Sequence, residues 1–247
     1  MTEDGASPLE PDEQRAAVRT RYAGLAEDDA GCSSESSDCC ETAADGPSEL
    51  GYRADEVASV PDGAKLSLGC GNPLAIDTLE PGEDVLDLGS GAGFDCFLAA
   101  TEVGSEGSVI GVDMTPEMLA RARRTAAEEG YDNVDFRLGE IESLPVADDS
   151  VDVIISNCVI NLSPNKPRVF EEAFRVLRPG GRLAISDVVL TAEPPDELRE
   201  DIDAIASCVG GAESIPRLST MLDAAGFKGV QINPKEDSTE FIREWSE

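Results

Sequence analysis

Short apolar runs and amphipathic stretches alternate through the middle of the chain. The run at 151–156 is almost wholly apolar except for Asp152, as expected of a strand that is covered on both faces. The amphipathic stretches between such runs have helical spacing, and Pro179 followed by two glycines ends one of them. The pattern predicts strands ending near 88 and at 109–113, 134–138, 151–156 and 182–187, with helices from 94, at 116–129 and at 164–177. This order predicts an α/β fold, a doubly wound, mostly parallel sheet of the Rossmann-like kind.

The N-terminal flank differs from this alternating region. Residues 1–50 are acidic and contain Tyr22 as their single aromatic side chain, a composition that predicts a largely mobile segment. Residues 16–25 have the pattern of one short amphipathic helix. The stretch at 31–41 is a polar tether with three cysteines, two of which are Cys39 and Cys40.

The pattern changes again beyond Leu190. We expect a helix through 206, a helix at 216–225 closed by Gly226 and a strand at 228–232, with no clear second strand after 236. Because ligands of such sheets bind outside the carboxyl ends of the strands, helical insertions at that edge are expected to form a substrate lid. The predicted division is an N-terminal segment at 1–50, a cofactor-binding core at 51–190, and a lid with C-terminal segment at 191–247.

A glycine cluster follows the first strand of the predicted core. Gly89, Gly91 and Gly93 alternate directly before a helix, so the backbone can turn tightly and bring its N–H groups against a ligand. Phe94 stands where a dinucleotide fingerprint has its third glycine. Asp113 closes the next strand, where an acidic residue can bind ribose hydroxyls. The loop therefore resembles motif I of class I S-adenosylmethionine methyltransferases, and a purely structural glycine turn is the less favoured interpretation.

Composition narrows the possible partners. The 247 residues are enough for one α/β domain with appendages. With 51 acidic and 19 basic residues, the net charge of -32 argues against nucleic acid or an anionic membrane as a partner, and it resembles the halophilic proteins of salt-accumulating organisms. The chain has no histidine, so it lacks the usual general base and the commonest metal ligand.

The cysteines are candidates for chemistry. Seven of them, without a signal peptide or a long apolar span, fit a reducing cytoplasm better than a disulfide framework. Cys70 precedes Asn72 and Pro73, which predict a helix start, and the helix dipole there is expected to lower the pKa of its thiol. Cys96, within an apolar helix, is expected in the core.

Two further cysteines lie at the expected ligand edge of the sheet. Cys158 follows a strand end within an unusually polar loop, which favours a site over a small buried side chain. Cys208 precedes two glycines on the predicted lid and could equally fill space at a helix end. If these two thiols converge with Cys70, they suit a soft, thiophilic centre. Zinc is the alternative, although the chain has no closely spaced Cys-x-x-Cys pair to support it.

Four motifs together resemble arsenite methyltransferases: Leu-Gly-Cys-Gly-Asn-Pro from Leu68, Gly-Val-Asp-Met-Thr-Pro-Glu-Met from Gly111, Ile-Ser-Asn-Cys-Val-Ile-Asn-Leu-Ser from Ile155, and Cys-Val-Gly-Gly-Ala from Cys208. The resemblance extends over about 16–245, although family members usually continue with another strand. It implies methyl transfer from S-adenosylmethionine, as cosubstrate and without a tightly bound metal, to arsenite or its thiol conjugates, for arsenic detoxification.

The resemblance also implies roles for individual residues. Cys70, Cys158 and Cys208 would bind trivalent arsenic, while Cys39 or Cys40 would enter a disulfide relay that thioredoxin or a small-thiol reductant regenerates. Asp113 would bind ribose, and Glu140 with Ile141 would contact adenine. The full set of residues expected to contact the cofactor is Asp87, Gly89, Ser90, Gly91, Asp113, Met114, Glu140, Ile141 and Asn157.

Two other functions remain open from the residues alone. A methyltransferase for a quinone-like or other small nucleophile would share the glycine loop without needing three convergent thiols. A non-catalytic metalloid-binding protein would need the thiols without needing an intact glycine loop, and here the loop is intact.

Overall fold

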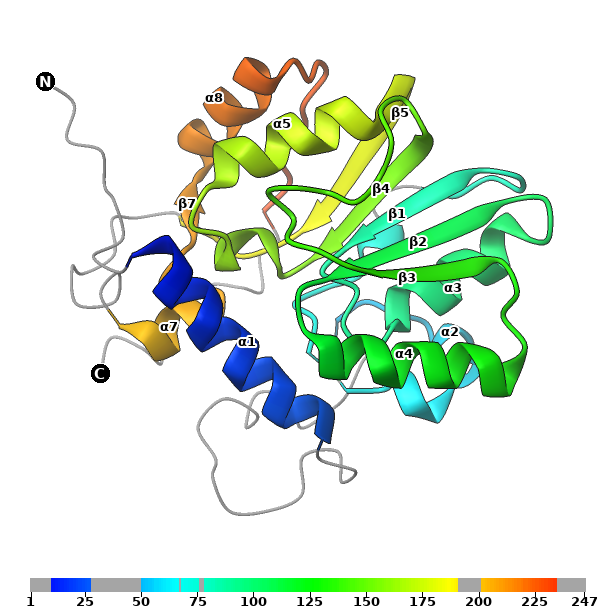
Figure 1. The fold of residues 1–247 in the computed structure, drawn as a ribbon. Helices are drawn as coiled ribbons and strands as arrows, with labels where there is room; N and C mark the ends of the chain where they lie inside the picture. The colour runs from blue at the N-terminus through cyan, green and yellow to red at the C-terminus, as the bar shows by residue number, and fades with distance from the viewer. Residues whose placement is uncertain (1–9, 28–49, 67, 76–77, 191–200, 235–247) are drawn as a thin grey trace, which may run out of the picture.

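The computed structural model describes residues 10–27, 50–66, 68–75, 78–190 and 201–234. Its centre is a parallel sheet with the order β3-β2-β1-β4-β5 (Figure 1). The strands are β1 (Asp84–Leu88), β2 (Ser108–Asp113), β3 (Val134–Leu138), β4 (Val151–Asn157) and β5 (Leu177–Ser186). The chain crosses from β3 past β2 and β1 to β4, and this reversal of strand order confirms the predicted doubly wound fold.

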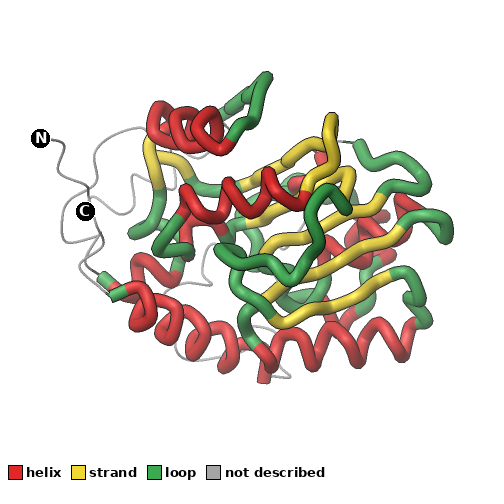
Figure 2. Tube along the Cα trace, turned by 45° about the horizontal axis from the view of Figure 1, so that its top comes forward, coloured by secondary structure: helices red, strands yellow, loops and turns green. Residues whose placement is uncertain are grey.

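Helices cover both faces of the sheet, with one layer on each face (Figure 2). On one face lie α3 (Phe94–Val103) and α4 (Pro116–Glu129), next to the short α2 (Ala54–Ser59) and η2 (Asp62–Ala64). On the other face lie α5 (Lys166–Val176) and α8 (Ile215–Ala225).

Each strand has apolar side chains on both faces. Val85 packs with Phe97 and Leu119 on the α3–α4 face, whereas the adjacent Leu86 packs with Phe170 and Val169 on the α5 face. Because successive strand side chains point in opposite directions, this alternation requires apolar residues at nearly every strand position. The continuous apolar runs in the sequence have this physical origin.

A third group of elements lies beyond the carboxyl ends of the strands. It consists of α1 (Pro11–Glu27), η3 (Pro73–Ala75), η4 (Ile160–Leu162), α7 (Ile202–Ala206), and the short parallel pair β6 (Val189–Leu190) and β7 (Glu213–Ser214). Helix α1, blue in Figure 1, lies beside α7 and also contacts α4. Two helices far apart in the sequence, α1 and α7, therefore lie together at the ligand edge of the sheet.

Several sequence predictions need correction. The strand predicted at 228–232 is wrong: these residues have no strand pairing among the described residues, because Gly229 turns the backbone at φ +69° and leaves Val230 exposed. The last sheet strand begins at Leu177 instead of 182, because Leu177 pairs with Val151 and the extra residues before Arg182, which pairs with Val153, form an irregularity in β5. The helices expected at 16–25 and 216–225 are present, and the first is longer than predicted.

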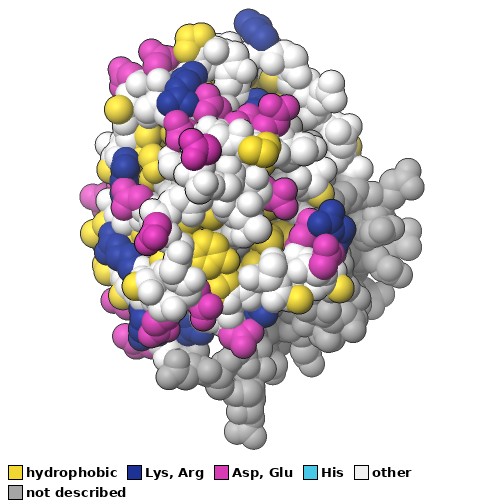
Figure 3. Space-filling model, turned by 90° about the vertical axis from the view of Figure 1, so that its right-hand side faces the viewer, with side chains coloured by type: hydrophobic (Ala, Val, Ile, Leu, Met, Phe, Trp, Pro, Cys, Tyr) yellow, Lys and Arg dark blue, Asp and Glu magenta, His cyan; other side chains and the backbone are white. Residues whose placement is uncertain are grey.

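The surface reflects the composition. On the face shown in Figure 3, acidic side chains are scattered among arginines and lysines, without a basic patch over the described residues. None of the described helices combines the length and the apolar character needed to cross a bilayer.

Candidate active site

The glycine loop after β1 is shaped by close contacts. Gly89 has φ +69°, and a Cβ there would collide with the side chain of Val159. Gly93 has φ +93°, and a Cβ there would lie 2.7 Å from Phe136 Cζ. The Gly91 N–H donates to Asp113 Oδ2 at 2.9 Å, so the carboxylate at the end of β2 also fixes the loop. The backbone can make this turn only with glycine at these positions.

A cavity lies at the carboxyl ends of β1, β2 and β4. Every residue predicted to contact the cofactor lines it except Glu140; those present are Asp87, Gly89, Ser90, Gly91, Asp113, Met114, Ile141 and Asn157. The Glu140 carboxylate instead pairs with Arg15, at 3.4 Å, and with Arg19 on α1. Ser90 also lines the cavity, and its Oγ is buried next to Gly111 without a hydrogen-bond partner among the described residues.

Three carboxylates lie along this cavity, of which Asp87 and Asp95 are buried and Asp113 is partly buried. Burial raises the pKa of Asp95 to about 6, and burial together with the charge of Asp95 raises the pKa of Asp87 well above its ordinary range. Burial also raises the pKa of Asp113, although backbone N–H groups of Thr115 and Gly91 oppose this rise. Such carboxylates favour a cationic ligand, because a positive charge would stabilise their ionised forms.

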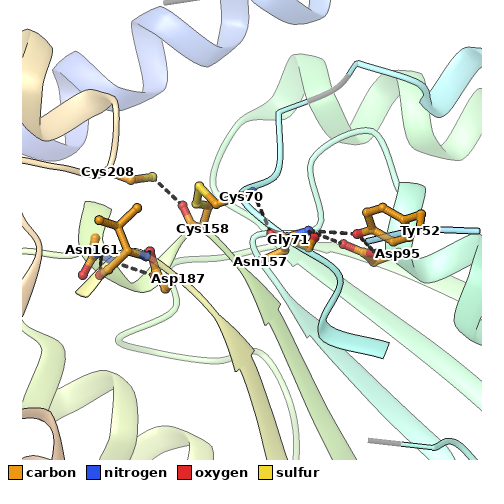
Figure 4. The surroundings of a disulfide bond; sticks show 10 residues. Tyr52, Cys70, Gly71, Asp95, Asn157, Cys158, Asn161, Asp187 and Cys208 are labelled. Carbon is orange, nitrogen blue, oxygen red and sulfur yellow. Dashed lines mark hydrogen bonds between the residues drawn. A yellow bond between two sulfur atoms is a disulfide. The ribbon is translucent and has the colours of Figure 1, made fainter. Parts of the chain in front are cut away.

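Asn157 connects this cavity with the loop of Cys70 (Figure 4). Its Nδ2 donates to Asp95 Oδ2 at 3.1 Å and to Gly71 O at 2.8 Å, while its Oδ1 accepts from the Cys70 N–H at 3.0 Å. The Tyr52 hydroxyl donates to Asp95 Oδ1 at 2.6 Å. One amide at the end of β4 therefore orients both a cavity carboxylate and the backbone of a cysteine.

Three sulfur atoms come together beside the cavity. Cys70 lies before η3, Cys158 directly after β4 and Cys208 two residues after the end of α7, and their sulfurs are all within 4.8 Å of one another. Cys70 and Cys158 form a disulfide with a Cα–Cα distance of 5.6 Å. Cys208 is a free thiol, whose Sγ donates to Cys158 O at 2.7 Å (Figure 4). The structure thus brings together the three thiols that the sequence predicted to converge.

The backbone at two of these cysteines is unusual. Cys158 has φ +56° and Cys208 has φ +71°, in the left-handed region that side-chain-bearing residues rarely adopt. Such conformations persist only where the surrounding structure holds them, and they are concentrated at functional sites. Their presence at two sulfur-bearing positions supports a site over a space-filling role.

The remaining cysteines are placed differently. Cys96 is fully buried in the core, as expected, and its thiol donates to Asp87 Oδ2 at 3.2 Å.

The helix start predicted after Cys70 is present only as a short turn. Asn72 caps this turn as predicted, with Oδ1 accepting from Leu74 N at 2.9 Å. However, η3 has only three residues and Cys70 is bonded to Cys158, so the expected thiolate character of Cys70 is not a property of this oxidised state. Cys39 and Cys40 lie outside the described residues.

Apolar side chains surround two of the three sulfurs, those of Cys158 and Cys208, whereas Cys70 is exposed. Val18, Leu162 and Ala206 form one cluster with Cys158 and Cys208, against which Tyr22 and Met114 also pack. Burial raises the pKa of Cys208 above its ordinary value, and the nearby Asp187 adds to this effect. Burial likewise raises the pKa of Asp187 to about 6, although N–H groups of Val188 and Asn161 oppose the rise.

The contributions of α1 were missed by the sequence analysis. Arg15, Val18 and Tyr22 of this helix line the cavity, so residues predicted to belong to a mobile segment form one of its walls. The helical pattern at 16–25 was recognisable, but periodicity within one helix does not identify the surface against which it packs. Tyr52 and Asp95 were missed for a similar reason, since their importance depends on contacts between distant segments.

Comparison with known proteins agrees with this geometry. A family model described as a methyltransferase domain matches residues 79–226, from just before β1 to the end of α8. The chain belongs to this methyltransferase family. A crystal structure of CrArsM, described as an arsenic (III) S-adenosylmethionine methyltransferase from Chlamydomonas reinhardtii, is similar to the chain with a TM-score of 0.59 and 36% identity, over 78% of this chain and 67% of that one. The predicted class I methyltransferase fold is confirmed.

Several relatives carry the name arsenite methyltransferase, and two of them show the range of similarity. The one from Halobacterium salinarum is 59% identical over 245 residues, which cover 96% of this chain and 63% of the relative. The human one is 40% identical over 152 residues, which cover 58% of this methyltransferase and 40% of the relative. The chain therefore spans less than two thirds of the length of either relative. The halophilic source of the first agrees with the acidic composition.

Proposed function

We propose that this methyltransferase transfers methyl groups from S-adenosylmethionine to trivalent arsenic held by Cys70, Cys158 and Cys208. The observation that carries the proposal is the triangle of sulfurs, all within 4.8 Å of one another, beside a cavity that Cys158 itself lines. Thiolates are soft ligands and trivalent arsenic is thiophilic, so the donor set matches this substrate. The Halobacterium salinarum relative, named arsenite methyltransferase, adds support.

The cavity fits S-adenosylmethionine, which supplies an electrophilic methyl group on a positively charged sulfur. Asp113 at the end of β2 would accept hydrogen bonds from ribose hydroxyls, while Gly89 and Gly91 allow a close approach of the methionine portion. The buried Asp87 and Asp95 suit a cationic ligand, because burial raises the pKa of each without one. Ile141 remains the proposed adenine contact, with Glu140 placed further out toward α1.

The absence of histidine is compatible with this reaction. Trivalent arsenic carries a lone pair and can attack the methyl carbon directly, so no side chain has to remove a proton from the nucleophile. The protein mainly contributes alignment: three thiolates replace the oxygen or thiol ligands of arsenic and fix its lone pair toward the cavity. The apolar side chains packed with Cys158 and Cys208 shield these two buried sulfurs from water, whereas Cys70 is exposed.

The electron balance assigns a role to the disulfide. When the arsenic lone pair forms the new carbon bond, arsenic is formally oxidised from +3 to +5 and the donor leaves as S-adenosylhomocysteine. Two protein thiolates can then give two electrons to arsenic by forming a disulfide, which returns it to +3. Cys70 and Cys158 are placed to form such a pair, since they are disulfide-bonded in the structure.

Further turnover requires reduction of that disulfide. We assign its reduction to a relay through Cys39 or Cys40, regenerated by thioredoxin or a small thiol. A reducing cytoplasm would supply such reductants. The relay rests on the family resemblance and on the three cysteines of the tether, which lies outside the described residues.

Arsenic speciation tests the proposal. The reduced protein is incubated with arsenite, S-adenosylmethionine and a dithiol, and the products are separated by chromatography with element-specific detection. Methylated arsenic that requires both protein and cofactor is the expected result. Cofactor binding without methylated arsenic would point to another small nucleophile, and arsenic binding without methyl transfer would point to a metalloid-binding protein.

A further inference from the structure

One aromatic side chain lies where the cofactor cavity meets the sulfurs. Tyr22 of α1 lines the cavity together with Cys158 and Met114, and it packs against the cluster that contains Cys158 and Cys208. Both Tyr22 and the Cys208 sulfur belong to the same packed group beside the cavity. None of the steps described above uses this side chain.

The position of the ring is fixed by its helix. Near one end of α1, Gln14 Nε2 donates to Leu162 O at 3.0 Å, next to the loop of Cys158. Near the other end, Arg121 of α4 donates to Ala26 O at 3.2 Å. Because α1 is tied to the domain at both ends, Tyr22 is presented from a rigid element and not from a loop.

The environment keeps the ring uncharged. Burial raises the pKa of Tyr22 well above its ordinary value; Cys208, when it is ionised, and the carboxylates of Asp113 and Asp187 add to the effect, while Arg21 opposes it. A neutral phenol beside Val18 presents mostly carbon to the sulfurs. Such a surface suits small apolar groups attached to a thiolate-bound atom.

We propose that Tyr22 limits the size of the organic group on the trivalent arsenical that the sulfurs hold. The inference rests on the proposed function and extends it to substrate selection. A bare arsenite or a methyl arsenical fits between the ring and the sulfurs, whereas an arsenical with a planar aryl group competes with the ring for the same space. Removing the ring would release this restriction.

Binding competition provides a readout that is separate from methyl transfer. All measurements use the whole chain with Cys32, Cys39 and Cys40 replaced by serine, so that the thiols of the tether do not capture the probes. In the reduced protein with S-adenosylhomocysteine, the affinities for arsenite and phenylarsine oxide are measured by competition with a soluble dithiol. The variants are Tyr22→Ala, Tyr22→Phe and, as a control on the exposed face of the same helix, Thr20→Ala.

Tyr22→Ala is expected to shift selectivity toward phenylarsine oxide over arsenite by about tenfold, within the range for size discrimination in an apolar pocket. Tyr22→Phe keeps the ring and should retain the wild-type ratio, as should Thr20→Ala. An unchanged ratio in a Tyr22→Ala protein with normal circular dichroism overturns the inference. An equal loss of affinity for arsenite and for phenylarsine oxide also overturns it, since that result indicates only a structural role for Tyr22.

A parallel methylation assay on the wild-type chain separates the two proposals. If arsenite is methylated but Tyr22→Ala leaves the affinity ratio unchanged, only the size limit fails. If arsenite is bound and the ratio shifts but no methyl group is transferred, the proposed function fails and the size limit stands. If the wild type binds neither arsenical, both fail.

Discussion

Glycines and carboxylates line the cavity where β1 and β2 end, whereas sulfurs and carbon side chains lie where β4 and α7 end. The first region comes from adjacent strands, and Asp113 bridges them by accepting the Gly91 N–H at 2.9 Å. The second is assembled from distant segments: Cys70 is 88 residues from Cys158, which is 50 residues from Cys208. The strands of the sheet thus position the residues of the cofactor cavity, whereas the position of the three sulfurs depends on segments that are far apart in the chain.

The two regions are nevertheless joined by Asn157. This side chain hydrogen-bonds Asp95 on the cofactor side and the Cys70 backbone on the sulfur side. If the regions have separate tasks, substitutions in one should leave binding at the other intact. The predictions that follow test this separation, beginning with the largest expected effect.

Cys158→Ser is expected to abolish methylation of arsenite while cofactor affinity stays unchanged. A hydroxyl is a harder and poorer ligand for a thiophilic centre, and the same change removes one half of the Cys70–Cys158 pair. Arsenic speciation and calorimetry with S-adenosylmethionine measure the two properties. Cys96→Ala, which removes a buried thiol outside the sulfur triangle, should retain arsenite binding. Wild-type methylation by a folded Cys158→Ser protein would refute the arsenic assignment.

Cys208→Ser should have a narrower effect that depends on the substrate. Arsenite has three positions for thiolates, so it needs all three sulfurs, whereas monomethylarsonous acid has only two. Cys70 and Cys158 could still hold the methylated substrate, as their pairing in the structure shows that they approach each other. Activity should therefore be lost with arsenite and retained with monomethylarsonous acid. Equal losses with both substrates would contradict the role of Cys208 as the third ligand.

Replacement of Cys39 and Cys40 by serine together should affect turnover more than capture. The variant should still bind trivalent arsenic through the other three thiols and complete an early methyl transfer. It should then stall when a thioredoxin-type protein is the sole reductant, because the active-site disulfide is no longer relayed. Single-turnover and multiple-turnover assays distinguish these stages. Wild-type kinetics in both assays would show that Cys39 and Cys40 have no role in turnover.

Asp113→Ala should weaken cofactor binding by about 10- to 100-fold, since a charge-assisted hydrogen bond contributes about 1.5–3 kcal/mol. Asp113 also accepts the Gly91 and Thr115 N–H groups, so the more conservative Asp113→Asn variant is needed beside it. Arsenic binding by the reduced sulfurs should be unaffected in both. Calorimetry with unchanged cofactor affinity in Asp113→Ala would remove the ribose assignment.

The different construction of the two regions also explains what could be predicted from the sequence. The strands, the glycine loop and Asp113 were recognisable because each depends on local pattern and short spacing. The convergence of Cys70, Cys158 and Cys208 was predicted from their places at strand and helix ends together with family resemblance. Their disulfide was not predicted from the residues, since pairing depends on distances between segments far apart in the chain.

Other features had no local pattern to reveal them. Helix α1 could be recognised, but its position over the cavity depends on contacts such as Gln14 with Leu162 O. The parallel pair of β6 and β7 is too short to have a periodicity, and the predicted strand at 228–232 failed at Gly229. Asp95 has the sequence pattern of an ordinary first-turn acid, and only its burial and its contacts with Tyr52 and Asn157 distinguish it.

Asp95 provides the smallest and most specific test of the cofactor region. Its folded-state pKa of about 6 lies above the ordinary value, so protonation stabilises the ligand-free fold. This contribution is lost as the pH rises through about 6. A cationic ligand reverses the preference, because it binds the ionised carboxylate more tightly. S-adenosylmethionine affinity should therefore rise by several-fold from pH 5 to pH 7.5.

Calorimetry at the two pH values measures this change in the wild type and in Asp95→Asn. The asparagine variant keeps a polar side chain beside Tyr52 but cannot ionise, so its affinity should depend less on pH; the residual dependence reflects Asp87 and Asp113, which also line the cavity. Asp223→Asn, at an exposed carboxylate on α8, should retain the wild-type profile. If Asp95→Asn also retains that profile, Asp95 does not sense the charge of the cofactor, and its contacts with Tyr52 and Asn157 serve only to position the Cys70 loop.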